Sequence, residues 1–313
     1  MANSDGTALQ TKKSGWIGKT LISLFFLVFV LGAVFYWRPS AITSATQQMG
    51  MWANGIHQNE VQLGSYRIHY LASGDNQGRP LVLVHGLGGR SLDWLGMIPQ
   101  FTKSGFKVYA PDLLGFGKSD KPDVDYSISL QTDILRQFLD SQSLQQADIV
   151  GWSMGGWISL KFAAENPQRV HRLSLLDSAG MRFEATNATA LLPTTTAELA
   201  HMMEILNPNP PAIPSFVARD ILRELVAQAW VVRRALVSMG TGKDLMDGKL
   251  QDVKMPVLIV WGKEDVLTPL SVGEAMHREM PQSILYVVNG CGHLAPTRCQ
   301  DNVVPEMQKF LAQ

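Results

Sequence analysis

The sequence predicts an α/β fold in which a mainly parallel sheet carries helices on both faces and an all-helical insertion. From about residue 60, short apolar runs alternate with stretches of helical periodicity, which is the pattern of parallel strands joined by right-handed crossovers. The interval 181–254 contains helical patterns and no strand pattern. We therefore expect a core of residues 51–180 and 255–313, interrupted by a helical lid formed by residues 181–254.

The strands are predicted from apolar runs bounded by turn residues. Val61–Leu63 and Tyr66–Leu71 flank Gly64-Ser65, which indicates an antiparallel hairpin. The later runs are apolar along most of their length, as in strands buried on both faces. They are Leu81–Val84, Val108–Asp112, Ile149–Trp152, Leu173–Asp177, Val257–Trp261 and Ile284–Val288.

The helices of the core and of the lid are predicted from their periodicity and their breakers. Apolar residues recur at helical spacing in Ser129–Leu139, and Met154–Glu165 ends before Asn166-Pro167. In the lid we expect helices at Thr196–Leu206, Ser215–Gln228 and Val231–Met239, after a loop at Ala185–Thr196. The abundance of Met and Leu in the lid is consistent with ordinary packing of a subdomain. It is equally consistent with an apolar inner face that contacts an apolar substrate.

The balance of charged residues argues against nucleic acid as a partner. Lys plus Arg and Asp plus Glu both number 27 in 313 residues, so no global field attracts nucleic acid.

Residues 1–50 are expected to form a cytoplasmic tail, a transmembrane anchor at about residues 17–37 and a linker. The stretch Leu21–Trp37 carries no charge and approaches the roughly 20 residues that span a bilayer.

Lysines at positions 12, 13 and 19 precede this stretch, which predicts a cytoplasmic N-terminus and a catalytic domain on the exported side, such as a bacterial periplasm. A cleaved secretory signal and a buried core helix are the alternatives. The bulky residues that follow the apolar stretch disfavour cleavage there.

The strongest chemical signal is Gly151-Trp152-Ser153-Met154-Gly155, between an apolar strand and a helix. This G-x-S-x-G pattern in that context predicts a nucleophile elbow, a strained turn that exposes the hydroxyl of Ser153. Glycines on both sides allow the backbone to close in without Cβ clashes. We expect Ser153 to be a nucleophile.

A serine hydroxyl needs a base, and the base needs a carboxylate. His293 follows the last predicted strand, at the sheet edge where the Ser153 turn also lies, and His85 is its main rival. Asp265 follows the strand Val257–Trp261 and precedes His293, with Asp177 as the substitute acid. The backbone N–H groups of Met154 and Leu87 are expected to hold an oxyanion, the latter from His85-Gly86-Leu87-Gly88-Gly89.

With these motifs the chain, from about residue 66 to 311, resembles the α/β-hydrolase superfamily of serine hydrolases. Pro111-Asp112-Leu113-Leu114-Gly115-Phe116-Gly117-Lys118-Ser119 and Asp177-Ser178-Ala179-Gly180 also match typical loops of that family. Within the family it is most similar to membrane-anchored monoacylglycerol lipases and small cold-active bacterial lipases. The resemblance implies hydrolysis of carboxylic esters of lipids such as monoacylglycerol, by Ser153 as nucleophile, Asp265 as acid and His293 as base, without a cofactor or a metal.

Residues near the elbow and the lid margin are the expected substrate contacts, namely His85, Gly86, Trp152, Met181 and Leu294. Two other functions stay open. Carbon–carbon bond hydrolases of ring-cleavage diketones keep the serine and need a cationic pocket, for which the lid offers Arg182, Arg219, Arg223, Arg233 and Arg234. A catalytically dead hydrolase fold that serves as a binding protein is the third reading.

The chain has two cysteines, Cys291 and Cys299, on either side of His293. If the domain is exported, they can form a disulfide, and otherwise they are two partly buried free thiols.

Overall fold

The computed structural model describes residues 19–20, 23, 32, 36–185 and 187–313 of the chain. Most of the predicted anchor at about residues 17–37 lies outside these residues. No helix within the described ranges has the length and the hydropathy needed to cross a bilayer.

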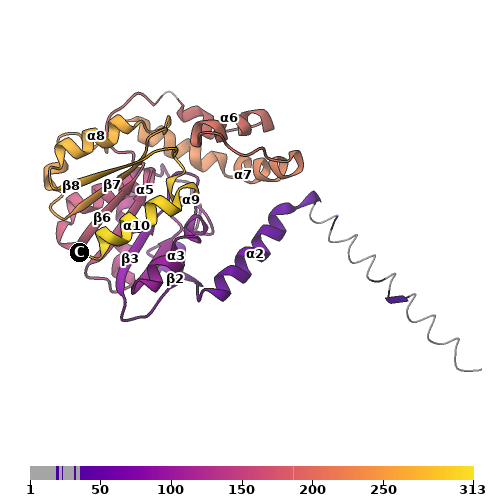
Figure 1. The fold of residues 1–313 in the computed structure, drawn as a ribbon, viewed down its shortest axis with the longest axis horizontal. Coiled ribbons are helices and arrows are strands. Elements are labelled where there is room, and N and C mark those ends of the chain that lie inside the picture. The colour runs from indigo at the N-terminus through magenta and orange to yellow at the C-terminus, as the bar shows by residue number, and fades with distance from the viewer. Residues whose placement is uncertain (1–18, 21–22, 24–31, 33–35, 186) are drawn as a thin grey trace, which may run out of the picture.

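An eight-stranded sheet forms the centre of the molecule, in the order β1-β2-β4-β3-β5-β6-β7-β8 (Figure 1). Strands β1 and β2 form the predicted antiparallel hairpin, β2 pairs antiparallel with β4, and the remaining neighbours are parallel. The sheet is therefore mainly parallel, as predicted. The strands are β1 (His57–Leu63), β2 (Tyr66–Ser73), β3 (Arg79–Val84), β4 (Phe106–Pro111), β5 (Ala147–Trp152), β6 (Val170–Leu176), β7 (Val257–Gly262) and β8 (Ser283–Val288).

Helices cover both faces of the sheet, which explains why the central strands are apolar throughout. In β3, Val82 and Val84 pack into the core on one face, while Leu81 and Leu83 pack into the core on the other face. Helices α4 (Ile128–Ser141), α5 (Met154–Glu165) and α8 (Leu270–Glu279) cover the first face. Helices α3 (Ile98–Lys103) and α10 (Gln300–Leu311) cover the second face, and the short α9 (Ala295–Arg298) precedes α10. The 3₁₀ turns of the core are Ser91–Trp94 and Pro167–Arg169.

The described residues between β6 and β7 form helices and turns and no strand, and they lie at one end of the sheet (Figure 1). Helix α6 (Thr196–Leu206) has the predicted bounds and begins with a capping box between Thr195 and Glu198. Helix α7 (Ser215–Gly240) is continuous, so the predicted break near residue 229 was wrong. The chain has no Gly or Pro between Pro214 and Gly240, and nothing therefore interrupts the helix. Short 3₁₀ turns occur at Ala188–Leu191, inside the predicted loop, and at Leu250–Asp252.

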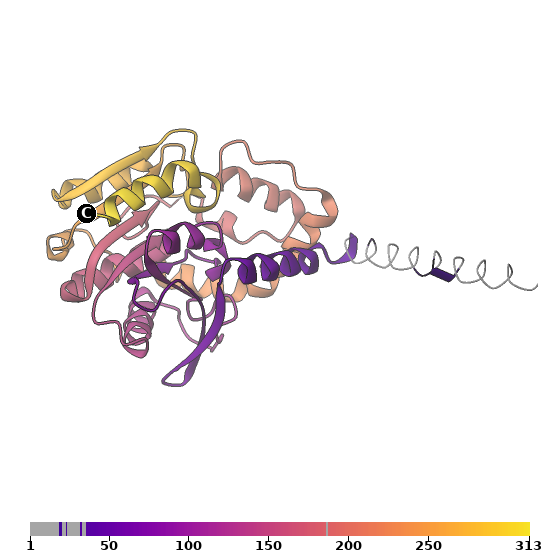
Figure 2. The ribbon, with the colours of Figure 1, turned by 60° about the horizontal axis from the view of Figure 1, so that its bottom comes forward.

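The expected linker up to residue 50 is largely helical. Helix α2 (Pro39–Ala53) begins with Pro39 in its first turn and ends before Asn54-Gly55, which are typical start and stop signals. It packs on α7, and the backbone N–H of Ser40 donates to Asp220 Oδ2 at 2.7 Å. In Figure 2, α2 leaves the core on the side where α6 and α7 lie. The segment before β1 is thus attached to α7.

Candidate active site

The three expected catalytic side chains come from loops that follow three different strands. Ser153 follows β5, Asp265 lies in the loop after β7, and His293 lies in the loop after β8. These strands are parallel, so their carboxyl ends share one edge of the sheet, where ligands bind in open α/β sheets. Residues separated by more than 100 positions in the sequence therefore meet at this edge.

Ser153 is held in a conformation that few non-glycine residues adopt. Its φ is 56° and its ψ is −119°, between the end of β5 and the first residue of α5. Its N–H donates to the carbonyl of Leu176, which fixes the turn to β6. A Cβ at Gly155 would lie 2.2 Å from the carbonyl oxygen of Val84, so only glycine fits beside the elbow. This packing keeps the strained turn in place.

His293 connects the serine to a carboxylate. The Ser153 hydroxyl lies 2.9 Å from His293 Nε2, and His293 Nδ1 lies 2.8 Å from Asp265 Oδ2. The imidazole is 3% exposed, and its backbone carbonyl accepts a hydrogen bond from Trp152 Nε1 at 2.9 Å. Both ring nitrogens are thus occupied, one by a proton donor and one by a proton acceptor. In this arrangement Nδ1 carries the proton, and Nε2 is free to take the serine proton.

Asp265 is fixed by its own loop. Its Oδ1 accepts hydrogen bonds from the N–H groups of Leu267 and Thr268, at 2.8 and 3.0 Å. The Thr268 hydroxyl donates to Asp265 Oδ2 at 2.7 Å and also lies 3.1 Å from His293 Nδ1. Sequence reasoning missed Thr268. The signal was present, because an Asp followed three residues later by a Thr is a pattern in which side chains bond to nearby backbone.

Asp177, the substitute acid, is placed differently. Its Oδ1 accepts from the Gly262 N–H at 2.7 Å, and its Oδ2 is buried without a hydrogen-bond partner among the described residues. Burial, followed by the nearby charge of Asp265, raises the pKa of Asp177 well above its usual range. Asp177 therefore makes no hydrogen bond to His293 and favours its neutral form.

His85, which we expected to contact the substrate, does not line either cavity beside Ser153. It is fully buried. Its Nδ1 lies 2.7 Å from the Gly86 carbonyl, and its Nε2 accepts from the Leu113 N–H at 2.9 Å. Burial lowers the pKa of His85, so the ring is a neutral brace between two loops. Its neighbour Gly86 does reach the nucleophile, since a Cβ there would lie 3.1 Å from Ser153 Cβ.

Two cavities meet at Ser153. One has a volume of about 320 Å³ and extends along the segment between β6 and β7, with Met181, Phe183 and Leu245 in its wall. The other has a volume of about 300 Å³ and contains Gly86, Trp152, His293 and Leu294. Both are lined mainly by apolar side chains, and four residues belong to both: Leu87, Ser153, Leu191 and Leu267. Four of the five expected substrate contacts thus lie in a cavity wall.

The expected oxyanion donors lie on the two sides of the serine. Leu87 follows Gly86 and lines both cavities. Met154 is buried and is the first residue of α5, where N–H groups have no partner within the helix. Elsewhere in the described chain, no group of three or more His, Cys, Asp or Glu side chains is placed to bind a metal ion.

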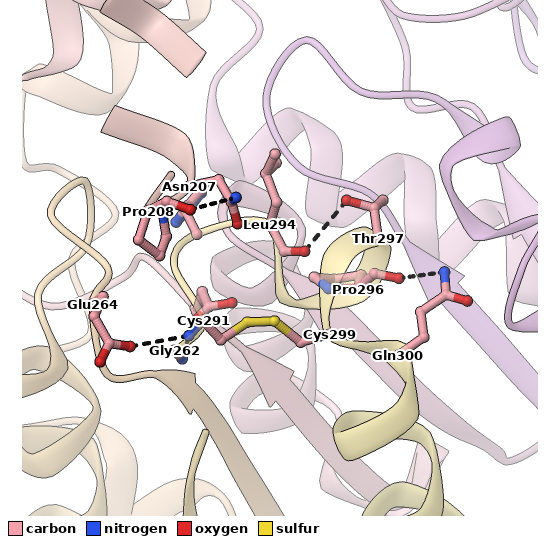
Figure 3. The surroundings of a disulfide bond; sticks show 12 residues. Asn207, Pro208, Gly262, Glu264, Cys291, Leu294, Pro296, Thr297, Cys299 and Gln300 are labelled. Atoms are coloured by element: carbon pink, nitrogen blue, oxygen red, sulfur yellow. Dashed lines mark hydrogen bonds between the residues drawn. A yellow bond between two sulfur atoms is a disulfide. The ribbon is translucent and has the colours of Figure 1, made fainter. Parts of the chain in front are cut away.

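Cys291 and Cys299 form a disulfide, the alternative that the sequence left open (Figure 3). Cys291 is completely buried and Cys299 is half-buried. The bond joins the start of the His293 loop to the residue before α10.

The chain matches two family models, one described as alpha/beta hydrolase fold over residues 79–237 and one described as TAP-like protein over residues 236–313. It is 30% identical to 2-hydroxymuconate semialdehyde hydrolase of Pseudomonas putida, over 81% of this chain and 94% of that protein. It is 27% identical to Lipase 1 of Psychrobacter immobilis, over 77% and 79% of the two chains. A crystal structure of a membrane phospholipase A superposes with a TM-score of 0.83 at 24% identity, covering 94% of this chain and 98% of the other, and shows the same fold.

Proposed function

Because the chain belongs to the α/β-hydrolase family and is a lipase- or esterase-type hydrolase, we propose that it cleaves carboxylic esters of lipids through an acyl-enzyme on Ser153. The observation that carries the proposal is the relay from Ser153 Oγ through His293 to Asp265, with distances of 2.9 and 2.8 Å. This is the geometry that nucleophilic catalysis by a serine requires. Monoacylglycerol and related acylglycerols are the substrates that we propose.

In the first step, Ser153 Oγ attacks the ester carbonyl while His293 Nε2 takes the hydroxyl proton. Asp265 accepts the hydrogen bond of His293 Nδ1 and stabilises the imidazolium that forms. The negative oxygen of the tetrahedral intermediate is held by the N–H groups of Met154 and Leu87. His293 then gives its proton to the leaving alkoxide, and the alcohol departs.

In the second step, His293 takes a proton from water as that water attacks the acyl-enzyme. Collapse of the second tetrahedral intermediate returns the proton to Ser153 Oγ and releases the fatty acid. No step requires a cofactor.

The two cavities support a lipid substrate. Ser153 stands where they meet, so the acyl chain and the alcohol of an ester can each occupy one of them. We assign the acyl chain to the cavity of about 320 Å³ under the lid. Its wall contains Met181, Met239 and Leu245, and burial of methylene groups against such side chains contributes about 0.8 kcal/mol each.

Carbon–carbon hydrolysis is the second candidate, because 2-hydroxymuconate semialdehyde hydrolase is among the relatives. A diketone acid carries a carboxylate, which needs a cationic partner when buried. Of the five lid arginines, Arg182 alone lines a cavity that reaches Ser153. Arg223 is paired with Asp220, and Arg234 with Asp123. This distribution favours an uncharged lipid ester.

A catalytically dead binding protein is disfavoured by the intact relay, because such a protein has no need for a serine held in a strained turn.

We also propose that the chain is a single-pass membrane protein whose N-terminus is cytoplasmic and whose catalytic domain lies on the exported side. The uncharged stretch Leu21–Trp37 supports this proposal. The disulfide supports it independently, because such bonds persist in oxidising compartments such as the periplasm.

The test uses the full-length chain in detergent with monoacylglycerol, p-nitrophenyl esters of several chain lengths and a ring-cleavage diketone. We expect hydrolysis of the lipid esters and a loss of about 10⁶-fold in kcat for Ser153→Ala. Ser104→Ala, which alters an exposed serine distant from the relay, is the matched control and should keep full activity. Unchanged turnover in Ser153→Ala would overturn the mechanism, and cleavage of the diketone alone would favour the second candidate.

A further inference from the structure

The loop of residues 291–299 carries His293 and is closed on itself by the disulfide between Cys291 and Cys299 (Figure 3). His293 is the third residue of this loop, and its ring contacts both Ser153 and Asp265. A movement of the backbone at His293 therefore acts on both distances of the relay.

The start of the loop is clamped to the end of β7. The Glu264 N–H donates to the Cys291 carbonyl at 2.9 Å, and the Cys291 N–H donates to Glu264 Oε2 at 3.0 Å. A Cβ at Gly262 would lie 2.5 Å from the Cys291 carbonyl oxygen, so the two backbones are in direct contact. This side of the loop is held by backbone contacts that exist without the disulfide.

The far end of the loop has a different kind of support. Helix α9 (Ala295–Arg298) is a single turn, and the Cys299 N–H donates to the Ala295 carbonyl at 3.1 Å. The disulfide ties this end to the clamped start of the loop. Without the bond, the covalent tie between Cys299 and the clamped start of the loop is lost, and the segment after His293 keeps the buried side chain of Ala295 and the hydrogen bond from Gln300 Nε2 to the Pro296 carbonyl at 2.7 Å.

The same loop supports the lid. The Leu294 N–H donates to the carbonyl of Leu206, the last residue of α6, at 3.2 Å. A Cβ at Gly292 would lie 2.8 Å from Pro208 Cδ, so the chain leaving α6 rests on the loop backbone. Figure 3 shows Pro208 and Asn207 beside Leu294, above the disulfide. The position of the α6 end is therefore coupled to that of His293.

We propose that the Cys291–Cys299 bond is a positioning device that holds His293 within reach of Ser153 and seats the end of α6 on the catalytic loop. The assignment rests on the proposed role of His293 as the base. It makes the reactivity of Ser153 sensitive to dithiol reductants. A dithiol breaks the S–S bond, becomes a cyclic disulfide, and leaves both cysteines as thiols, with two electrons and two protons transferred.

A displacement of about 1 Å in a catalytic group can cost about 100-fold in rate. Because the Glu264 clamp remains after reduction, we expect a smaller displacement and a loss of about tenfold.

The first experiment measures the rate at which a fluorophosphonate labels Ser153, because this reaction needs the base but no particular ester. We expect the cysteine-free variant Cys291→Ala/Cys299→Ala to be labelled about tenfold more slowly than the wild type, but to the same final stoichiometry. A merely structural bond would lower the number of sites that can be labelled and leave the rate per site unchanged. That result would overturn the proposal.

The second experiment treats the wild type with dithiothreitol and uses the cysteine-free variant as the matched control, since the chain has no other cysteine. Labelling of the wild type should slow to the rate of the variant and recover on reoxidation, while the variant should not respond. An equal response of both proteins, or none in a wild type shown by mass to be reduced, would contradict the proposal.

A third measurement tests whether the disulfide positions the end of α6, by comparing KM for two kinds of ester. For esters with long alcohol groups, KM of the cysteine-free variant should rise more than for esters of p-nitrophenol, because Leu206 and Leu294 line the cavity assigned to the alcohol. An equal rise for both esters would overturn this arm of the proposal. Failure of the proposed function has a separate signature, in which Ser153 is labelled but the wild type hydrolyses no ester.

Discussion

Two loops at the carboxyl edge of the sheet each carry a buried histidine, and only one of them is built for proton transfer. His293, after β8, lies between the Asp265 carboxylate and the Ser153 hydroxyl. His85, after β3, lies between the Gly86 carbonyl and the Leu113 N–H. Both rings use both nitrogens, but those of His85 contact backbone groups that neither accept nor supply a proton in a reaction.

A third histidine sharpens this contrast. His69 Nδ1 lies 2.8 Å from Asp112 Oδ2, the same distance that separates His293 from Asp265. Its Nε2 lies 3.3 Å from Gln58 Oε1, and within the described part of the chain it makes no hydrogen bond to a hydroxyl. A buried histidine–carboxylate pair is thus not sufficient for catalysis. The partner on the other nitrogen decides whether the pair braces a loop or serves as a base.

The strongest test of this contrast is His293→Gln. The variant keeps a polar side chain but has no base, so we expect kcat for ester hydrolysis to fall by about 10⁴-fold or more. The free energy of unfolding should change by about 1 kcal/mol or less, because the surrounding hydrogen bonds are partly replaced. Ester assays and urea titrations measure the two effects. A large loss of stability with retained turnover per folded molecule would show that His293 braces its loop and is not the base.

The carboxylate is tested by Asp265→Asn, with Asp177→Asn as its matched control. An amide in place of Asp265 favours the wrong tautomer of His293, and we expect kcat to fall by about 10⁴-fold. Asp177 makes no hydrogen bond to His293 and favours its neutral form, so Asp177→Asn should cost less than about tenfold. Equal losses in both variants would mean that the acid is shared between the two residues.

The opposite outcome is expected for His85→Phe. This change leaves the buried Leu113 N–H and the Gly86 carbonyl unpaired, which should lower the free energy of unfolding by about 1–3 kcal/mol. Turnover per active site, counted by fluorophosphonate titration, should stay within about tenfold of the wild type. Complete loss of labelling in a folded variant would show that the ring acts on the reaction directly.

For Asp112 we expect an effect on stability alone, at acid pH. Burial would raise the pKa of this carboxyl, but hydrogen bonds from His69 and from the N–H groups of Lys118 and Ser91 lower it to about 2. A carboxyl with a depressed pKa in the folded state stabilises the protein above its unfolded pKa near 4. The contribution of about 2 kcal/mol is lost as the pH falls through 2. Urea unfolding of the wild type from pH 5 to 2 should show this loss, and the free energy of unfolding of Asp112→Asn should fall less over the same range. An equal fall in both proteins would contradict the prediction.

Much of the fold could be predicted from local patterns. The apolar strands, the glycines around Ser153 and the bounds of α5 and α6 follow from residues that are close in the sequence. The order Ser153, Asp265, His293 could be placed at one edge because parallel strands end together. The split of α7 was wrong because a weak local pattern was read as a break where no breaker exists. Helix α2 was missed because the apolar stretch before it dominated that region.

By itself, the sequence determined the alternation of strands and helices, the elbow and the candidate side chains, because each depends on neighbours along the chain. The tertiary structure alone placed His293 Nε2 at 2.9 Å from the Ser153 hydroxyl and buried the ring of His85 completely. It also placed Thr268 against Asp265 and closed the bond between Cys291 and Cys299. These outcomes depend on distances between loops, which packing of the whole sheet and lid sets and which no local pattern encodes.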